Sequence, residues 1–244
     1  MDLGLRGKNA LVLGASKGLG RAVAKELVEE GARVAICART AAALHRTADE
    51  IGATAFACDL DEAGAPTKLV EDAAAVLGPI DIVVINTGGP PTAVFDEITL
   101  DQWRGAFDSL FMSAVEILNA VLPHMRRMNW GRVLFITSIA AKEPINRFAL
   151  SNSLRSGLHG LVNSLSKEEA ARGITVNALM PGYTMTERLA DAKLDLDRIT
   201  QLIPARRIGR PDEFAALAAF LASQRASYIT GQAVACDGGA LASI

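Results

Sequence analysis

The segment Gly14-Ala15-Ser16-Lys17-Gly18-Leu19-Gly20, "GASKGLG", separates a short apolar run from an amphipathic stretch. Its glycines permit a tight turn and let backbone N–H groups approach a phosphate, and the N-terminus of a following helix adds a dipole that favours an anion. Glycine spacing alone is weak evidence, but this strand–turn–helix context favours a phosphate-binding loop over a plain turn. The sequence therefore predicts that a dinucleotide cofactor contacts Gly14, Ser16, Lys17, Gly18, Leu19 and Gly20.

Strand-like and helix-like segments alternate along the chain. Repeated β–α units with apolar strands predict a parallel sheet covered on both faces, and right-handed crossovers make such a sheet doubly wound. We therefore expect an α/β fold, a single Rossmann-type domain over residues 1–244 with a seven-stranded parallel sheet and helices on both faces. The expected strands cover residues 9–13, 33–37, 53–58, 80–85, 132–136, 174–180 and 233–236, and the expected helices cover 19–30, 40–51, 66–77, 100–127 and 151–172.

Composition limits the partners that the chain could have. Its 244 residues are 50% hydrophobic, and 25 basic against 27 acidic residues give a net charge of -2, which does not suggest a nucleic-acid surface. We see no signal peptide, and the longest apolar runs look too short to span a membrane. Cys37, Cys58 and Cys236 are widely spaced without a metal-ligand pattern, so we expect buried packing residues in a reducing cytoplasm.

The end of the second expected strand distinguishes the two nicotinamide dinucleotides. NAD sites usually place an acid there, which accepts a hydrogen bond from the ribose 2′-hydroxyl, but this chain has Ala38 and Arg39. Arg39 and the loop residue Lys17 could pair with a 2′-phosphate, although single surface cations are commonly just solvated. The missing acid together with two cations favours NADP(H) over NAD(H). Asp59, after the third strand, could hydrogen-bond the adenine or cap the segment that follows it.

Several further motifs resemble the short-chain dehydrogenase/reductase family, with the 3-oxoacyl-acyl-carrier-protein reductase branch the most similar. The glycine loop resembles that family's TGxxxGxG, with Leu13 in place of the threonine. The other matching segments are "CDL" at residues 58–60, Asn86-Thr87-Gly88-Gly89 for NNAG, Ser138 after the fifth strand, "RGITVNALMPGY" at residues 172–183, Thr186, and "ASYITGQAVACDGG" at residues 226–239.

The resemblance implies a set of roles for these positions. Ser138 would be the catalytic serine, and residues 187–203 would form a lid over the substrate pocket. It also implies a homotetramer that uses the helices at residues 100–127 and 151–172 for one interface and the C-terminal strand region for another. Further cofactor contacts would come from Asp59, Leu60, Asn86, Gly88, Pro181, Gly182, Thr184 and Thr186.

The catalytic positions depart from the family pattern of Asn, Ser, Tyr and Lys. The YxxxK motif is replaced by Ser151 and Arg155, and the asparagine position falls on Leu110, so only Ser138 is retained. In the family the tyrosine gives a proton to the carbonyl oxygen, and an aliphatic hydroxyl is a much weaker acid than a phenol. Arg155 could still hold the ribose hydroxyls with its five N–H donors, but its high pKa makes it a poor proton source.

Tyr183 follows Pro181-Gly182 at the expected cleft, where it could be a replacement acid or an aromatic wall residue. Two functions remain open. The first is an NADP(H)-dependent oxidoreductase that acts on a small-molecule carbonyl or alcohol with an atypical proton-transfer site. The second is a cofactor-binding protein with little catalysis, such as a sensor or a partner subunit of an active reductase. The retained cofactor motifs favour the first.

Overall fold

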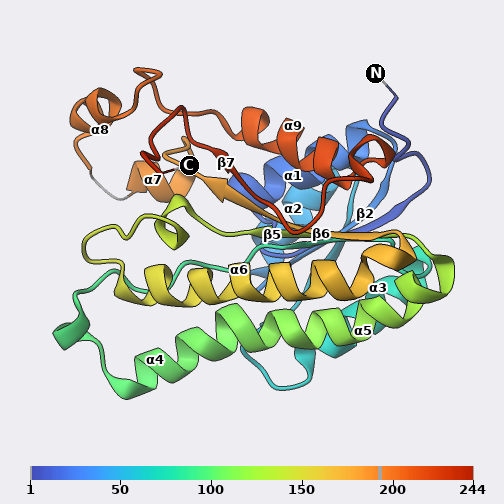
Figure 1. Cartoon of the computed structure of the whole chain (residues 1–244). Helices are drawn as coiled ribbons and strands as arrows, with labels where there is room; N and C mark the ends of the chain where they lie inside the picture. Colours follow the sequence, from blue (N-terminus) through green and yellow to red (C-terminus); the bar gives the residue numbers. More distant parts are fainter. Residues whose placement is uncertain (1, 192–193, 244) are drawn as a thin grey trace.

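The computed structural model describes residues 2–191 and 194–243, and a sheet of seven parallel strands forms its centre (Figure 1). The spatial order of the strands is β3-β2-β1-β4-β5-β6-β7. The predicted seven-stranded parallel sheet of a doubly wound Rossmann-type fold is therefore confirmed. The strands are β1 (Asn9–Val12), β2 (Arg33–Ala38), β3 (Thr54–Ala57), β4 (Ile82–Ile85), β5 (Gly131–Ile136), β6 (Ile174–Pro181) and β7 (Ala233–Cys236).

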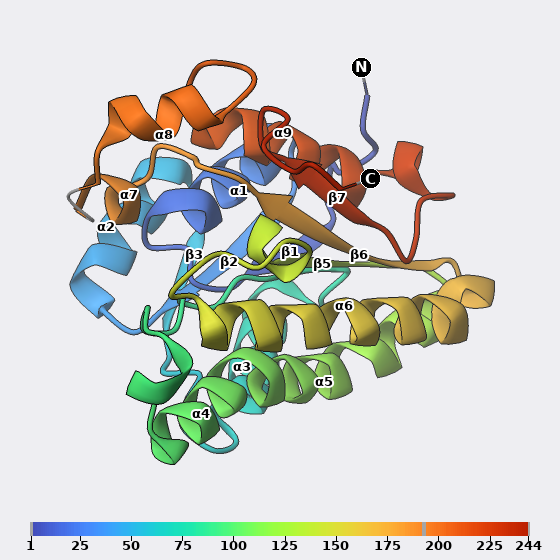
Figure 2. The ribbon, with the colours of Figure 1, turned by 60° about the vertical axis from the view of Figure 1, so that its left-hand side comes forward.

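Helices cover both faces of the sheet, as predicted (Figures 1 and 2). One face carries α1, α2 and α9, while α3, α5 and α6 lie on the other face and α4 packs beside α6. The short helices α7 and α8 lie together at one end of the sheet (Figure 1). The helices are α1 (Gly18–Glu29), α2 (Ala41–Ile51), α3 (Ala65–Leu77), α4 (Leu100–Phe107), α5 (Ser113–Met128), α6 (Ala149–Glu169), α7 (Glu187–Asp191), α8 (Leu196–Leu202) and α9 (Pro211–Ala222).

The core consists of two apolar layers, one on each face of the sheet. Val12 and Ile36 belong to the layer under α1, α2 and α9, whereas Leu11 and Val83 belong to the layer under α3, α5 and α6. Successive side chains of a strand point to opposite faces, so each strand contributes to both layers. This arrangement explains why the strands read as continuous apolar runs in the sequence.

The helix expected over residues 100–127 is present as one helical stretch from Leu100 to Met128, but its winding changes within it. A π-helical segment, Asp108–Met112, separates α4 from α5, and Leu110 lies at its centre. By length and composition alone the helical stretch Leu100–Met128 could cross a membrane, because an 18-residue window within it has a mean hydropathy of 1.4. The expectation that every apolar run is too short is therefore wrong. Ile117 and Val121 of this stretch pack in the core under the sheet, however, which accounts for its apolar character without a membrane.

Two other expectations need correction. The helix α9 was not expected, although Pro211 in its first turn and the acids that follow are typical helix-start signals. Of the three cysteines only Cys37 is buried, while Cys58 and Cys236 are partly exposed, so the expected packing role holds fully for Cys37 alone.

Candidate active site

The glycine loop lies where the order of the sheet reverses direction. β1 pairs with β2 on one side and with β4 on the other, so the carboxyl ends of β1 and β4 border a crevice that can receive a ligand. Gly14 and Gly18 have φ values of 58° and 60°, which favour glycine. A side chain at Gly20 would collide with the carbonyl of Gly14, and Asn86 holds that carbonyl by donating a 3.0 Å bond from Nδ2.

The loop leaves the first turn of α1 open to a phosphate. Lys17 precedes the helix in an extended conformation, and no side chain caps the N-terminal N–H groups. Unpaired N–H groups at a helix N-terminus, together with the helix dipole, attract an anion. A cavity of about 300 Å³ opens beside them, and it is lined by Gly18, Arg21, Ala22, Met185, Thr186, Glu187, Ala190 and Pro211. These features fit the pyrophosphate of a dinucleotide.

The residues expected to choose between the two cofactors lie at the surface. Arg39 follows β2 and is exposed, and Lys17 is exposed as well. Asp59 Oδ1 accepts a 3.2 Å hydrogen bond from the Asp61 N–H, which is the capping role that the sequence left open. The neighbouring Cys58 N–H donates to the Ala38 carbonyl and ties this turn to the end of β2.

The retained and substituted catalytic positions come together beyond the end of β5. Ser138 lies just after the strand, and its Oγ accepts a 3.1 Å hydrogen bond from the Ala140 N–H. Ser151 stands in the first turn of α6 and is 7% exposed. Leu110, at the asparagine position, is 1% exposed and offers no polar atom from its side chain. The elements that carry these three positions pack against one another, since α6 contacts both the turn after Ser138 and the π-helical segment.

Arg155 is anchored to the strand that leads to Ser138. Its Nη1 donates hydrogen bonds of 2.9 Å and 3.1 Å to the carbonyls of Ile136 and Thr137. Burial lowers the pKa of Arg155 to about 10, and the nearby Arg188 acts in the same direction. The guanidinium therefore remains charged at neutral pH. Both of these hydrogen bonds use Nη1, so Nε and Nη2 of Arg155 can donate to a ligand.

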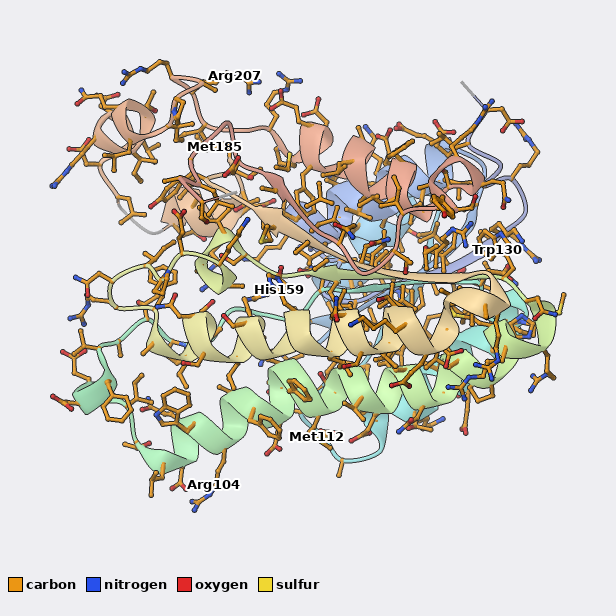
Figure 3. All side chains as sticks on the ribbon, in the orientation of Figure 1. Arg104, Met112, Trp130, His159, Met185 and Arg207 are labelled. Carbon is orange, nitrogen blue, oxygen red and sulfur yellow. The ribbon has the colours of Figure 1, made fainter. Side chains whose placement is uncertain are left out.

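His159 occupies the side of α6 that faces the sheet (Figure 3). Its Nε2 lies 3.0 Å from Thr137 Oγ1, and the Thr137 hydroxyl also donates to the Leu179 carbonyl. Burial lowers the pKa of His159, and Arg155 lowers it further, so the imidazole is neutral at pH 7. His159 therefore supports the strand end beside Arg155 and adds no charge there.

Tyr183 follows β6, whereas Ser138 follows β5. Tyr183 lines a separate cavity of about 130 Å³ with residues that precede α9 and residues that follow β7, among them Arg207 and Asp237. Its carbonyl accepts a 2.9 Å bond from the Gly209 N–H, which fixes this segment against the α8–α9 connection. This position is that of a wall residue of the cavity, and the catalytic role suggested for Tyr183 stays a prediction.

The segment predicted as a lid lies against two glycine positions of the crevice. A side chain at Gly18 would come within 3.6 Å of Thr186 and 3.8 Å of Glu187 Oε2. A side chain at Gly89 would collide with the guanidinium of Arg188. Sequence reasoning missed Glu187, Arg188 and Gly89, because only the position of α7 brings them to the crevice. Residues 192–193 of the predicted lid lie outside the described residues.

Known proteins with sequences and structures similar to this chain cover nearly all of it. Residues 14–240 match the family described as enoyl-(acyl carrier protein) reductase. An acetoacetyl-CoA reductase from Shinella zoogloeoides is 35% identical over 94% of this chain and 97% of its own length. A 3-oxoacyl-acyl-carrier-protein reductase from Salmonella typhimurium is 33% identical over 97% of this chain and 98% of its own length. The structure of a 3-oxoacyl-acyl-carrier-protein reductase from Agrobacterium tumefaciens with NADP bound superimposes with a TM-score of 0.93 at 33% identity, covering 98% of this chain and 96% of that one.

Proposed function

This chain belongs to the short-chain dehydrogenase/reductase family of oxidoreductases, and from that membership we propose that it uses NADP(H) to interconvert a small carbonyl compound and its alcohol through an atypical proton-transfer site. The observation that carries the proposal is the open N-terminus of α1 behind the glycine loop, in one crevice with Thr186. A nicotinamide cofactor supplies the hydride when it is bound.

Residues of the chain would bind the cofactor and hold the substrate oxygen. The N–H groups of the glycine loop bind the pyrophosphate, and Thr186 closes the crevice over Gly18. Ser138 donates its hydroxyl hydrogen to the substrate oxygen, since its Oγ already accepts from Ala140. Ser151 is too weak an acid to replace a tyrosine, so the proton must come from water or from the substrate itself. Loss of a general acid lowers rates by roughly 10²–10⁴, which leaves slow turnover possible.

One observation favours the second candidate function, a cofactor-binding protein with little catalysis. The Nη1 of Arg155 is held by two backbone carbonyls, as a structural arginine would be. The buried Leu110 also removes the polar group that the family has at this position. The experiment that separates the two functions is NADPH oxidation against a panel of ketones and oxo acids, with calorimetry of both cofactors. Binding without turnover on every compound would favour the second candidate.

We expect the Arg39→Asp variant to shift cofactor preference from NADP(H) toward NAD(H). The change removes a cation that can pair with the 2′-phosphate and supplies an acceptor for the ribose 2′-hydroxyl. Calorimetry should show NADPH binding weakened by about tenfold or more, while NADH binding holds or improves. Parent protein that binds NADH as tightly as NADPH would contradict the proposed preference.

We also propose that the whole chain acts as one nucleotide-binding domain with residues 187–203 as a lid, and that it works in the cytoplasm. The continuous sheet from β1 to β7 supports the first point. Cys37, Cys58 and Cys236 are free thiols although Cys37 and Cys58 are neighbours, which fits a reducing compartment.

We expect the chain to form a homotetramer. Large apolar side chains are exposed on and beside the α4–α5 face, including Leu100 at 71%, Phe107 at 41% and Met112 at 38%. Figure 3 shows Met112 on the outer side of these helices, away from the sheet. Burying such a patch between subunits would stabilise the assembly. Light scattering that shows a stable monomer would contradict the prediction.

A further inference from the structure

Two arginines that the family pattern does not account for meet at the same edge of the sheet. β4 and β5 are parallel neighbours in which Ile85 pairs with Phe135, so the segments that follow them run side by side. Arg155 is bonded to the carbonyls of Ile136 and Thr137 at the end of β5. Arg188 reaches the other segment, because its guanidinium lies against Gly89 after β4.

Gly89 is what makes room for Arg188. The three atoms nearest to the position of a side chain at Gly89 are Cζ, Nη1 and Nη2 of Arg188. A residue larger than glycine would displace this guanidinium from the crevice. The pairing of Gly89 on one segment with Arg188 on another therefore places a cation over the end of β4.

No carboxylate neutralises the two arginines in the part of the chain that the structure describes, where neither takes part in an ion pair. The nearest acid along the chain, Glu187, points instead toward Gly18. The positive charge of Arg188 also lowers the pKa of Arg155, after the larger effect of burial. Of the two, Arg155 is buried and Arg188 is exposed. A buried cation without a counter-ion is costly, so the position of Arg155 is suited to an anion.

We propose that Arg155 and Arg188 form a carboxylate-binding pair, so that the substrate of this chain is a small oxo acid or the corresponding hydroxy acid. The proposal rests on the proposed oxidoreductase function, and it names the substrate class of that site. A carboxylate matches the planar donor fork of arginine, which can bind it with two parallel hydrogen bonds. The site lies beside Ser138, so a carboxylate held there would place the neighbouring carbonyl group near the Ser138 hydroxyl.

The other anion in reach is the pyrophosphate of the cofactor. The glycine loop and the open first turn of α1 already provide for it, and Glu187 rather than Arg188 faces that loop. Arg188 lies across the crevice, over the segment after β4. Because Glu187 lies near the glycine loop and Arg188 lies near Gly89, the substrate is favoured over the cofactor as the partner of Arg188.

The test compares acids with uncharged analogues of the same shape. 2-Oxobutyrate, acetoacetate and 4-oxopentanoate would be titrated into the NADP⁺-loaded protein by calorimetry, each beside its primary amide. We expect at least one acid to bind about tenfold more tightly than its amide. In the Arg188→Met variant this preference should fall below about twofold while NADP⁺ affinity stays unchanged. Arg188→Lys should keep part of the preference, because a point charge remains without the fork.

The Arg104→Met variant is the matched control, because it also removes one positive charge and lies on the outer side of α4 (Figure 3). It should keep the full preference for the acid. Equal binding of every acid and its amide, or no binding of any acid, would overturn the proposal. So would an Arg188→Met variant that loses NADP⁺ affinity and keeps the acid preference. Turnover of neutral ketones without an acid preference would refute this inference alone, whereas acid preference without any turnover would refute only the oxidoreductase function.

Discussion

The Gly20→Ala variant should lose NADPH affinity by about tenfold or more, which corresponds to about 1.4 kcal/mol. The added Cβ would collide with the Gly14 carbonyl and lie 2.7 Å from Asn86 Nδ2 and 3.0 Å from the Ala15 Cα. Two of these three neighbours are backbone atoms, so the start of α1 must move away from the loop. That movement displaces the N–H groups that would bind the pyrophosphate. Overpacking of this kind also destabilises a fold by about 1–3 kcal/mol.

Gly105→Ala provides the control for this substitution. Gly105 lies in α4, and a Cβ there would meet no atom within 4 Å. Replacing a helical glycine by alanine stabilises the helix by about 1 kcal/mol, and cofactor affinity should not change. Calorimetry and thermal unfolding of both variants separate a local effect at the loop from a general effect of removing a glycine. A Gly20→Ala protein that binds NADPH like its parent would show that the loop tolerates the shift.

The fold could be predicted because its signals are local. An apolar strand, the "GASKGLG" turn and an amphipathic helix follow one another within a short segment, and the repeat of such units specifies the doubly wound sheet. The π-helical segment around Leu110 could not be predicted, because the apolar spacing of residues 100–127 reads as an ordinary helix. Helix α9 was missed for another reason: it is apolar on most sides and lacks the amphipathic period.

The sequence could predict the candidate site only where its residues lie close together along the chain. Ser138 could be placed because it closely follows β5, and Ser151 and Arg155 because they lie on α6, the next long element of the chain. The direction of Tyr183 depends on how residues 182–185 pair with Gly209, which the sequence does not reveal. The contact of Arg188 with Gly89 joins segments about a hundred residues apart, and it depends on where α7 docks.

Alanine variants can show whether Arg155 contributes to cofactor binding as well as to the fold. Arg155→Ala should weaken NADPH binding by more than about tenfold if its free nitrogens hold the ribose. It should also destabilise the protein, because the carbonyls of Ile136 and Thr137 lose a donor. Ser151→Ala should leave NADPH binding nearly unchanged, since a small hydroxyl contributes roughly 1 kcal/mol. Unchanged NADPH affinity in Arg155→Ala would exclude the ribose role and leave the contacts with the end of β5 and the proposed contact with a substrate carboxylate.

The double variant Ser151→Tyr with Arg155→Lys should remain at least about 100-fold slower than the 3-oxoacyl-acyl-carrier-protein reductase from Salmonella typhimurium, measured with acetoacetyl-CoA and NADPH under the same conditions. A tyrosine restores the acid, but Ser151 is only 7% exposed, so the larger ring must displace its neighbours. A lysine has one nitrogen, so an ammonium bonded to the end of β5 as Nη1 is now would lack the two other guanidinium nitrogens. Leu110 still offers no polar atom at the asparagine position, and Arg188 still lies against Gly89 after β4. A double variant that reached the rate of the Salmonella enzyme would show that the rest of the site is that of an ordinary ketoreductase, and that Leu110 and Arg188 place no limit on the reaction.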